Sequence, residues 1–134
     1  MEQQTTTEPI NPSKIMQIGM GFWASKVILA AVKFKLFTLL ADTSKSGKEI
    51  KEALQLGTTD RHVYDWLDTM VSLGFLKREG LLDNARYSNA SDSEMFLDTK
   101  KPTYIGGILL MANNRLYYHW ANLEEGFADR QSTK

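Results

Sequence analysis

The sequence predicts a mainly α-helical fold, a winged helix-turn-helix with a small two-stranded wing, flanked by long helices. Two short helical patterns, each opened by a capping residue, occupy residues 46–74. Two runs typical of short strands follow around a turn, and apolar residues recur at helical spacing on either side of this region. At 134 residues the chain is expected to form one domain, and its 43% hydrophobic residues suffice for a core.

The first helical region, residues 15–40, is unusually apolar. Residues 1–12 before it are polar and contain two prolines, so we expect a flexible N-terminal arm there. Between Phe22 and Val32 the apolar side chains surround the helix. A helix that is apolar on all sides needs cover on all sides, and in so small a domain a second subunit is the simplest source of that cover.

The charge balance, the positions of the lysines and the absence of cysteine limit the environments and partners that the protein could have. Sixteen acidic and sixteen basic residues cancel, so no overall field favours nucleic acid or an anionic surface. Lys26, Lys33 and Lys35 interrupt the apolar region, whereas a bilayer span needs about 20 predominantly apolar residues, so we expect no membrane segment. The absence of cysteine excludes disulfides and thiolate catalysis and agrees with a cytoplasmic protein.

The middle region is predicted to form two helices with defined ends. Ser46 and Glu49 have the spacing of a capping box, which satisfies free backbone donors at the start of the first helix. Gly57 is expected to end that helix. Thr59 is expected to cap the second helix, which Gly74 ends.

A hairpin and two further helices are predicted after the second helix. Phe75–Arg78 and Arg86–Ser88 are expected to form the two strands of the wing. Ser91 and Glu94 repeat the capping-box spacing before a short helix, and Pro102 suits the first turn of a long last helix. The apolar core stripe expected on that last helix consists of Ile105, Ile108, Leu109, Ala112, Leu116, Trp120, Leu123 and Phe127.

Winged helix-turn-helix domains are commonly associated with DNA, so DNA binding is the first hypothesis to weigh. Neutralising phosphates requires lysine and arginine, but the second helix, 60–74, carries only Arg61 against three aspartates. Over residues 46–90 six basic residues face seven acidic ones. Lys77 and Arg78 in the wing could still touch a DNA backbone, but no basic face is expected, and we predict no nucleic-acid partner.

Nucleotide and metal binding are also disfavoured. Gly19–Ala24, with Asp42 further on, fits the glycine pattern of dinucleotide-binding loops, but such loops work only between a strand and a helix. Here a helical pattern runs through the glycines, which we expect to permit close helix packing, as Gly106 and Gly107 would in the last helix. The two histidines, at 62 and 119, lack neighbours at metal-ligand spacing. His119 could act as a general base if a hydroxyl substrate reached it, but we favour a structural role for it.

Five segments in a fixed order carry a resemblance to a known family. They are Leu36–Leu40, Ser46–Leu56, Leu67–Leu76, Tyr104–Gly107 and Trp120–Gly126. Their succession resembles the N-terminal dimerisation domain of class I S-adenosylmethionine-dependent O-methyltransferases, in the group of plant caffeate and acetylserotonin enzymes and bacterial polyketide and hydroxyneurosporene enzymes. The resemblance covers residues 13–127.

The resemblance implies a homodimer whose winged-helix domains intertwine and help to wall the pocket for the methyl acceptor. The acceptor would be a small molecule with a hydroxyl group, aromatic or polyketide-like. S-adenosylmethionine would bind a catalytic domain expected after the tail at 128–134, so no cofactor site and no catalytic residue is expected in this chain. The candidate pocket residues are Phe22 and Trp23 on the first helix and Met111, Arg115 and Tyr118 on the last.

Two functions from different classes therefore stay open. The main prediction is a dimerisation and acceptor-lid module of a small-molecule O-methyltransferase, with no activity of its own in this chain. The alternative is a dimeric winged-helix transcriptional regulator that binds DNA or a small effector. A salt-sensitive complex with DNA would favour the alternative.

Overall fold

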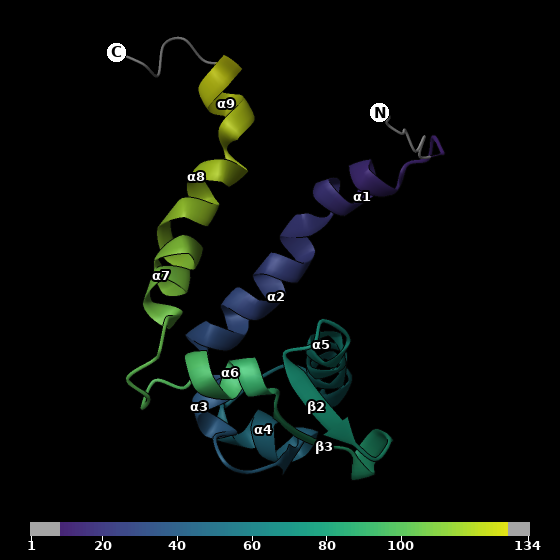
Figure 1. Cartoon of the computed structure of the whole chain (residues 1–134), viewed down its shortest axis with the longest axis vertical. Coiled ribbons are helices and arrows are strands. Elements are labelled where there is room, and N and C mark those ends of the chain that lie inside the picture. Colours follow the sequence, from purple (N-terminus) through teal and green to yellow (C-terminus); the bar gives the residue numbers. More distant parts are fainter. Residues whose placement is uncertain (1–8, 129–134) are drawn as a thin grey trace, which may run out of the picture.

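Two long helical segments lead away from a small core of short helices and a sheet (Figure 1). The computed structural model describes residues 9–128, and the rest of the predicted N-terminal arm and of the predicted tail lies outside the described residues. The first segment comprises α1 (Ser13–Gly19) and α2 (Gly21–Lys33). The second, called the C-terminal segment below, comprises α7 (Gly106–Met111), a π-helical turn (Ala112–Leu116), α8 (Tyr117–Ala121) and α9 (Leu123–Ala128).

The core lies between the sheet, four helices and the end of α2, which contributes Ala31 and Val32. The four helices are α3 (Leu36–Leu39), α4 (Gly47–Ala53), α5 (Asp60–Ser72) and α6 (Ser91–Phe96). In α5 the buried residues Val63, Leu67 and Met70 recur every three or four positions, so the helix turns one apolar face inward. The core residues with no exposed surface include Leu36, Phe37, Leu40, Ile50, Leu67 and Met70.

The sheet has three antiparallel strands in the order β1-β3-β2. The strands are β1 (Lys45–Ser46), β2 (Leu76–Glu79) and β3 (Arg86–Asn89). The sheet therefore has one strand more than the predicted two-stranded wing, because β1 lies directly before the first predicted helix of the middle region, where no strand was predicted. Arg86 holds the chain just before this strand in place: its guanidinium donates to the backbone oxygen of Ser44 at 2.7 Å and to the Ser44 hydroxyl at 3.1 Å.

Three of the predicted helix ends are confirmed. The Ser46 hydroxyl accepts a hydrogen bond from the Glu49 N–H, and the Glu49 carboxylate accepts one from the Ser46 N–H, which makes the expected capping box. The Thr59 hydroxyl accepts from the His62 N–H at the start of α5. Gly74 follows α5 with φ of 88°, a conformation that glycine adopts without steric cost.

Two other helix ends differ from the prediction. Helix α4 ends at Ala53 and the chain turns at Gln55, with φ of 56°, so Gly57 is not its terminating residue. Helix α6 has Ala90 as its N-cap without a side-chain hydrogen bond, so the predicted capping box of Ser91 and Glu94 was wrong. The reason is that the Glu94 carboxylate binds groups outside its own helix, as described below.

The predicted long last helix starts later and is interrupted. It begins at Gly106 rather than near Pro102, because the preceding loop is held against α6 by a 2.8 Å hydrogen bond from Ile105 N–H to the Phe96 backbone oxygen. A π-helical turn and a break at Asn122 then divide the C-terminal segment. Its side chains therefore do not follow the single helical repeat that the sequence suggested.

The glycines expected to permit close packing fall into two groups. A Cβ atom on Gly106 would lie 2.2 Å from the Tyr104 hydroxyl oxygen, so this position favours glycine. Gly19, Gly21 and Gly107 have no neighbour within 4 Å of such an atom. The expected close packing is therefore absent at these three positions within the described part of this single chain.

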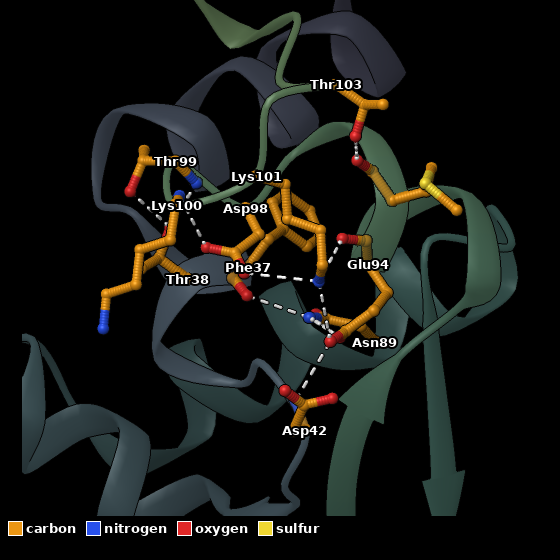
Figure 2. Close-up of polar contacts among 11 residues, drawn as sticks. Phe37, Thr38, Asp42, Asn89, Glu94, Asp98, Thr99, Lys100, Lys101 and Thr103 are labelled. Atoms are coloured by element: carbon orange, nitrogen blue, oxygen red, sulfur yellow. Dashed lines mark hydrogen bonds and ion pairs between the residues drawn. The ribbon is translucent and has the colours of Figure 1, made fainter.

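Glu94 joins three parts of the chain (Figure 2). Its Oε1 accepts a 2.7 Å hydrogen bond from Asn89 in β3, and its Oε2 accepts one of 3.1 Å from the backbone N–H of Asp42. The ammonium group of Lys101 lies 3.2 Å from Glu94 Oε2 and donates to the Glu94 backbone oxygen at 3.1 Å. Lys101 thereby attaches the loop between α6 and α7 to the core.

The same loop has a second anchor at Asp98, a residue that is only 3% exposed. Asp98 accepts a 3.0 Å hydrogen bond from the Lys100 N–H, and its other oxygen lies 3.4 Å from Lys101 Nζ. The Thr99 N–H donates to the Thr38 hydroxyl at 2.9 Å (Figure 2). These contacts set the direction in which the C-terminal segment leaves the core.

The same contacts lower the pKa of both carboxyl groups. Burial raises the pKa of Glu94, but hydrogen bonds from Asn89 and Lys101 outweigh burial, so that pKa lies below its usual value. The backbone N–H of Lys100 is the main cause that lowers the pKa of Asp98. A group with a lowered pKa stabilises the fold above its unfolded-state pKa, and this contribution is lost as the pH falls through the folded-state pKa.

We predict that Glu94→Gln lowers the free energy of unfolding at pH 7 and that this difference shrinks at acid pH, as the pH falls below the ordinary pKa of glutamate and through the lowered pKa of the folded-state carboxyl group. Urea unfolding at pH 7 and pH 3 measures both effects. Glu52→Gln, which changes an exposed side chain of α4, is the matched control. It should leave the free energy of unfolding unchanged at both pH values. A Glu94→Gln variant as stable as the wild type at pH 7 would contradict the role given to Glu94.

We also predict that Leu67→Ala, in the centre of the core, lowers the free energy of unfolding by about 2–5 kcal/mol through lost burial and a cavity. Leu81→Ala, on a side chain that is 69% exposed, should change it by no more than about 0.5 kcal/mol. Denaturant unfolding at neutral pH compares the two variants. Equal losses of unfolding free energy in the two variants would contradict the placement of Leu67 in the core.

Candidate functional site

An aromatic groove lies between α2 and the C-terminal segment. It has a volume of about 550 Å³. The residues used below to define it are Phe22, Ser25 and Leu29 from α2 and Leu116, Tyr117 and Trp120 from the C-terminal segment. Its size falls in the range of small-molecule sites, about 300–1,000 Å³, and apolar side chains dominate its lining.

Lys26 contacts one of the residues that line this groove. Its ammonium group, on α2, donates a hydrogen bond to Oδ1 of Asn113 and lies 4.9 Å from the centre of the Tyr117 ring. Asn113 belongs to the π-helical turn and is only 3% exposed. The turn thus supplies a buried acceptor that fixes the lysine beside an aromatic ring, a favourable cation–π arrangement.

Among the predicted pocket residues, the structure places the two on α2 in different cavities. Phe22 lines the aromatic groove. Trp23 lies in a separate cleft of about 360 Å³ that also includes Met20, Thr69 and Leu73. The two neighbouring aromatic side chains therefore face different parts of the molecule.

The predicted pocket residues of the C-terminal segment do not line the groove. Met111, Arg115 and Tyr118 are exposed. Tyr118 packs edge-on against Tyr117, with ring centres 6.2 Å apart, and so touches a residue that does line it. The role of these three residues in an acceptor pocket remains a prediction, because that pocket would include surfaces of a partner subunit.

Sequence reasoning missed Lys26, Asn113 and Tyr117. In the sequence Lys26 interrupts an apolar helix, and a cation in such a helix is itself a signal that it has a partner. No pattern marked the π-helical turn that brings Asn113 to it. The expected core stripe of the last helix was also wrong for a single chain, since Ile108 is 64% exposed and Trp120 is 67% exposed.

A second polar cluster surrounds Asp68 on α5. Its Oδ1 accepts hydrogen bonds from the Tyr87 hydroxyl at 2.7 Å and from Arg78 at 3.0 Å. Burial, followed by the hydrogen bond to Asp68, raises the pKa of Tyr87 well above its usual value. A phenol held protonated in this way supports packing between α5 and the sheet and is unsuited to act as a base.

The described residues offer little for metal or nucleotide chemistry. Within residues 9–128 no group of three potential metal ligands is found. Gly19 and Gly21 lie between two helices, so they lack the preceding strand that a dinucleotide-binding loop requires. His62 is exposed and its Nδ1 lies 2.7 Å from the Thr58 hydroxyl, while His119 is exposed on α8.

The first helical segment also meets the length and composition of a membrane span. Ser13–Lys33 covers 21 residues with a hydropathy of 1.5, and 17% of its most apolar window is buried in this chain. A helix covered by another protein subunit meets the same criteria. The expectation that no segment enters a membrane therefore stays a prediction.

Comparisons with known proteins agree with the described fold. Residues 16–99 match the model of the O-methyltransferase dimerisation domain. A Streptomyces glaucescens protein named as the tetracenomycin polyketide synthesis 8-O-methyl transferase TcmO is 38% identical over 114 residues, which are 85% of this chain and 32% of that protein. The acetylserotonin O-methyltransferase of Gallus gallus is 29% identical over 121 residues, which are 90% of this chain and 35% of that enzyme.

The solved structures include human N-acetylserotonin methyltransferase in complex with SAM. It superimposes with a TM-score of 0.79 at 24% identity, over 94% of this chain and 36% of that one. The chain thus spans about a third of the length of the relatives that it matches. Because the family model covers more than half of the sequence, the chain belongs to the family of O-methyltransferase dimerisation domains.

Proposed function

We propose that two copies of this chain form a homodimer, and that the dimer helps to wall the acceptor pocket of a cytoplasmic, S-adenosylmethionine-dependent O-methyltransferase acting on a small molecule. The observation that carries the proposal is the exposure of large apolar side chains along both helical segments. In this arrangement α4, α5 and the β2–β3 hairpin form a winged helix within a dimerisation domain at residues 13–127.

The exposed apolar residues lie on α1 and the start of α2 and along the C-terminal segment. On α1 and α2 they include Ile15, Ile18, Phe22 and Trp23. On the C-terminal segment they include Ile108, Leu116, Trp120, Leu123 and Phe127. Contiguous apolar surface of this kind is unfavourable in water and marks an interface in soluble proteins. A second copy supplies the matching surface, because the same two segments recur on it.

The methyl donor is assigned to a part of the parent enzyme that this chain does not span. An adenosine cofactor is commonly bound at a glycine-rich turn between a parallel strand and a helix, and the described residues offer only short antiparallel strands. The residues present therefore do not fit S-adenosylmethionine, and no step of methyl transfer is assigned to them. Their contribution is to bind and enclose the acceptor.

Aromatic side chains in and near the groove support the proposed class of methyl acceptor. Phe22 lies in the groove, and Trp23, Met111, Arg115 and Tyr118 lie where a partner subunit or a catalytic domain could approach them. Flat aromatic surfaces favour a flat acceptor. The name of the Streptomyces glaucescens relative, a polyketide methyltransferase, agrees with an aromatic or polyketide-like hydroxyl compound as the acceptor.

Ion pairs within the chain argue against the alternative of a DNA-binding regulator. Lys51 Nζ lies 2.9 Å from an Asp60 oxygen, and Arg78 lies 3.0 Å from one of Asp68. Arg86 is held by Ser44 and lies 3.5 Å from the Glu49 carboxylate. These cations are already paired with acidic groups of the same surface, so they provide no basic face for phosphates.

We predict that the chain is dimeric and that Ile18→Glu shifts it towards monomer, with the dissociation constant raised about tenfold or more, because a carboxylate would enter the apolar interface. Sedimentation velocity over a concentration series measures the effect. Leu82→Glu is the matched control, since Leu82 is 84% exposed and Ile18 is 76% exposed, but Leu82 lies at the tip of the hairpin.

A wild-type chain that stays monomeric at all concentrations would overturn the proposed homodimer. An equal loss of dimer in both variants would move the interface away from the helical segments. Circular dichroism on the same samples shows whether the variants keep the helical content of the wild type.

A further inference from the structure

We infer that the π-helical turn, Ala112–Leu116, sets the rotational phase of the C-terminal segment, so that exposed apolar side chains on both sides of the turn meet a second copy on one face. This rests on the proposed function, because it says what orients part of the proposed dimer interface. Three features carry it: the hydrogen bonds of the turn, the spacing of the apolar residues around it, and the contacts of Lys26 that hold the turn against α2.

The hydrogen-bond pattern of the C-terminal segment changes at the turn. Before it, the Ala112 N–H donates to the backbone oxygen of Ile108, four residues earlier, as in a regular α-helix. At its end, the Tyr117 N–H donates to the backbone oxygen of Ala112, five residues earlier. The turn therefore holds one residue more than an α-helical turn, and the residues that follow it lag in rotation by about 100°, the step of one residue.

This lag keeps a row of apolar residues on one face of the segment. Ile108, Leu116 and Trp120 are exposed. Ala112 completes the row, in which each residue follows the previous one by four positions. In a regular α-helix such a row drifts by about 40° at each step, so Trp120 would lie about 120° round the helix from Ile108. The one-residue lag removes most of this drift, and Ala112, Leu116 and Trp120 accordingly line the same groove.

Lys26 holds the turn against α2. Its ammonium group donates to Asn113 Oδ1 inside the turn and lies 4.9 Å from the ring centre of Tyr117, whose N–H closes the turn. Asn113 is almost fully buried, so its amide oxygen needs a partner within the chain. The phase of the row is thereby set relative to α2, and Phe22 on α2 lines the groove together with Leu116.

A second copy of this chain is the partner that the row fits. The chain belongs to a dimerisation-domain family, and the row shares its groove with Phe22, one of the exposed apolar residues of α2. Apolar side chains that stay in line along a helix can face another helix over several turns, whereas a row that winds round the helix leaves the contact. The extra residue in the turn thus determines how much of the segment the second copy covers.

The test changes the length of the turn by one residue in each direction. Deleting Asn114, an exposed residue of the turn, should leave a regular α-helix in which Leu116 and Trp120 keep their phase relative to Ile108. We expect this variant to form a dimer with a dissociation constant close to that of the wild type. An alanine inserted after Asn114 rotates both side chains by about 100° and should raise the dissociation constant about tenfold or more, because they leave the interface.

Two measurements follow the dimer and the turn separately. Sedimentation velocity over a concentration series gives the dissociation constants, and NMR couplings across hydrogen bonds identify the carbonyl that accepts from the Tyr117 N–H. In the deletion variant this acceptor should still be Ala112, which then lies four positions earlier. In the insertion variant the acceptor should move to Asn113 or Asn114. Circular dichroism shows whether both variants keep the helical content of the wild type.

Two substitutions test the same face without changing the length of the chain. Leu116→Glu places a carboxylate in the row and should raise the dissociation constant about tenfold or more. Asn114→Glu, in the same turn but outside the row, is the matched control and should leave the dissociation constant unchanged. If the insertion variant fails to fold, these two substitutions and the deletion variant still decide.

A wild-type dimer that the deletion weakens as much as the insertion, or that neither change weakens, would overturn the inference and leave the homodimer intact. A deletion variant in which the Tyr117 N–H no longer donates to Ala112 would overturn it as well. A wild-type chain that stays monomeric at all concentrations would overturn the proposed homodimer and, with it, the role given to the turn.

Discussion

The carboxylate of Glu94 is the contact on which the arrangement of this chain depends. It receives hydrogen bonds from Asn89 at the end of β3 and from Asp42 after α3, and an ion pair from Lys101 in the loop that leads to α7. These three partners come from separate parts of the sequence, so one side chain ties the sheet, the first helices and the C-terminal segment together. Removing the Glu94 carboxylate takes a hydrogen-bond acceptor from the buried amide of Asn89 and the ion-pair partner from Lys101, which is partly exposed.

The apolar surface outside the core has a physical explanation in the same arrangement. The core includes Ala31 and Val32 from the end of α2, whereas α1, the start of α2 and the C-terminal segment extend beyond it and bury few of their side chains (Figure 1). Membership of a dimerisation-domain family accords with apolar helices that remain uncovered in one copy.

Lys26 shows how a polar residue acquires a role inside such a surface. In the sequence it breaks an apolar run, but in the structure its ammonium group spans from α2 to Asn113 and Tyr117 on the C-terminal segment. The contact depends on the π-helical turn, because that turn contains the buried amide. The pairing of Lys26 with Asn113 is therefore a product of how α2 packs against the C-terminal segment, far away in the sequence.

The sequence by itself determined the local features: the capping box of Ser46 and Glu49, the cap at Thr59 and the turn at Gly74. Each depends on residues within a few positions of one another, where the chain needs no distant partner. Of the candidate site, only Phe22 was both predicted and found in the groove. The tertiary structure alone decided the third strand, the late start of the last helix and the pairing of Lys26 with Asn113. These features depend on contacts between segments far apart in the sequence, such as Arg86 with Ser44 and Glu94 with Lys101, and periodicity along one segment carries no information about them.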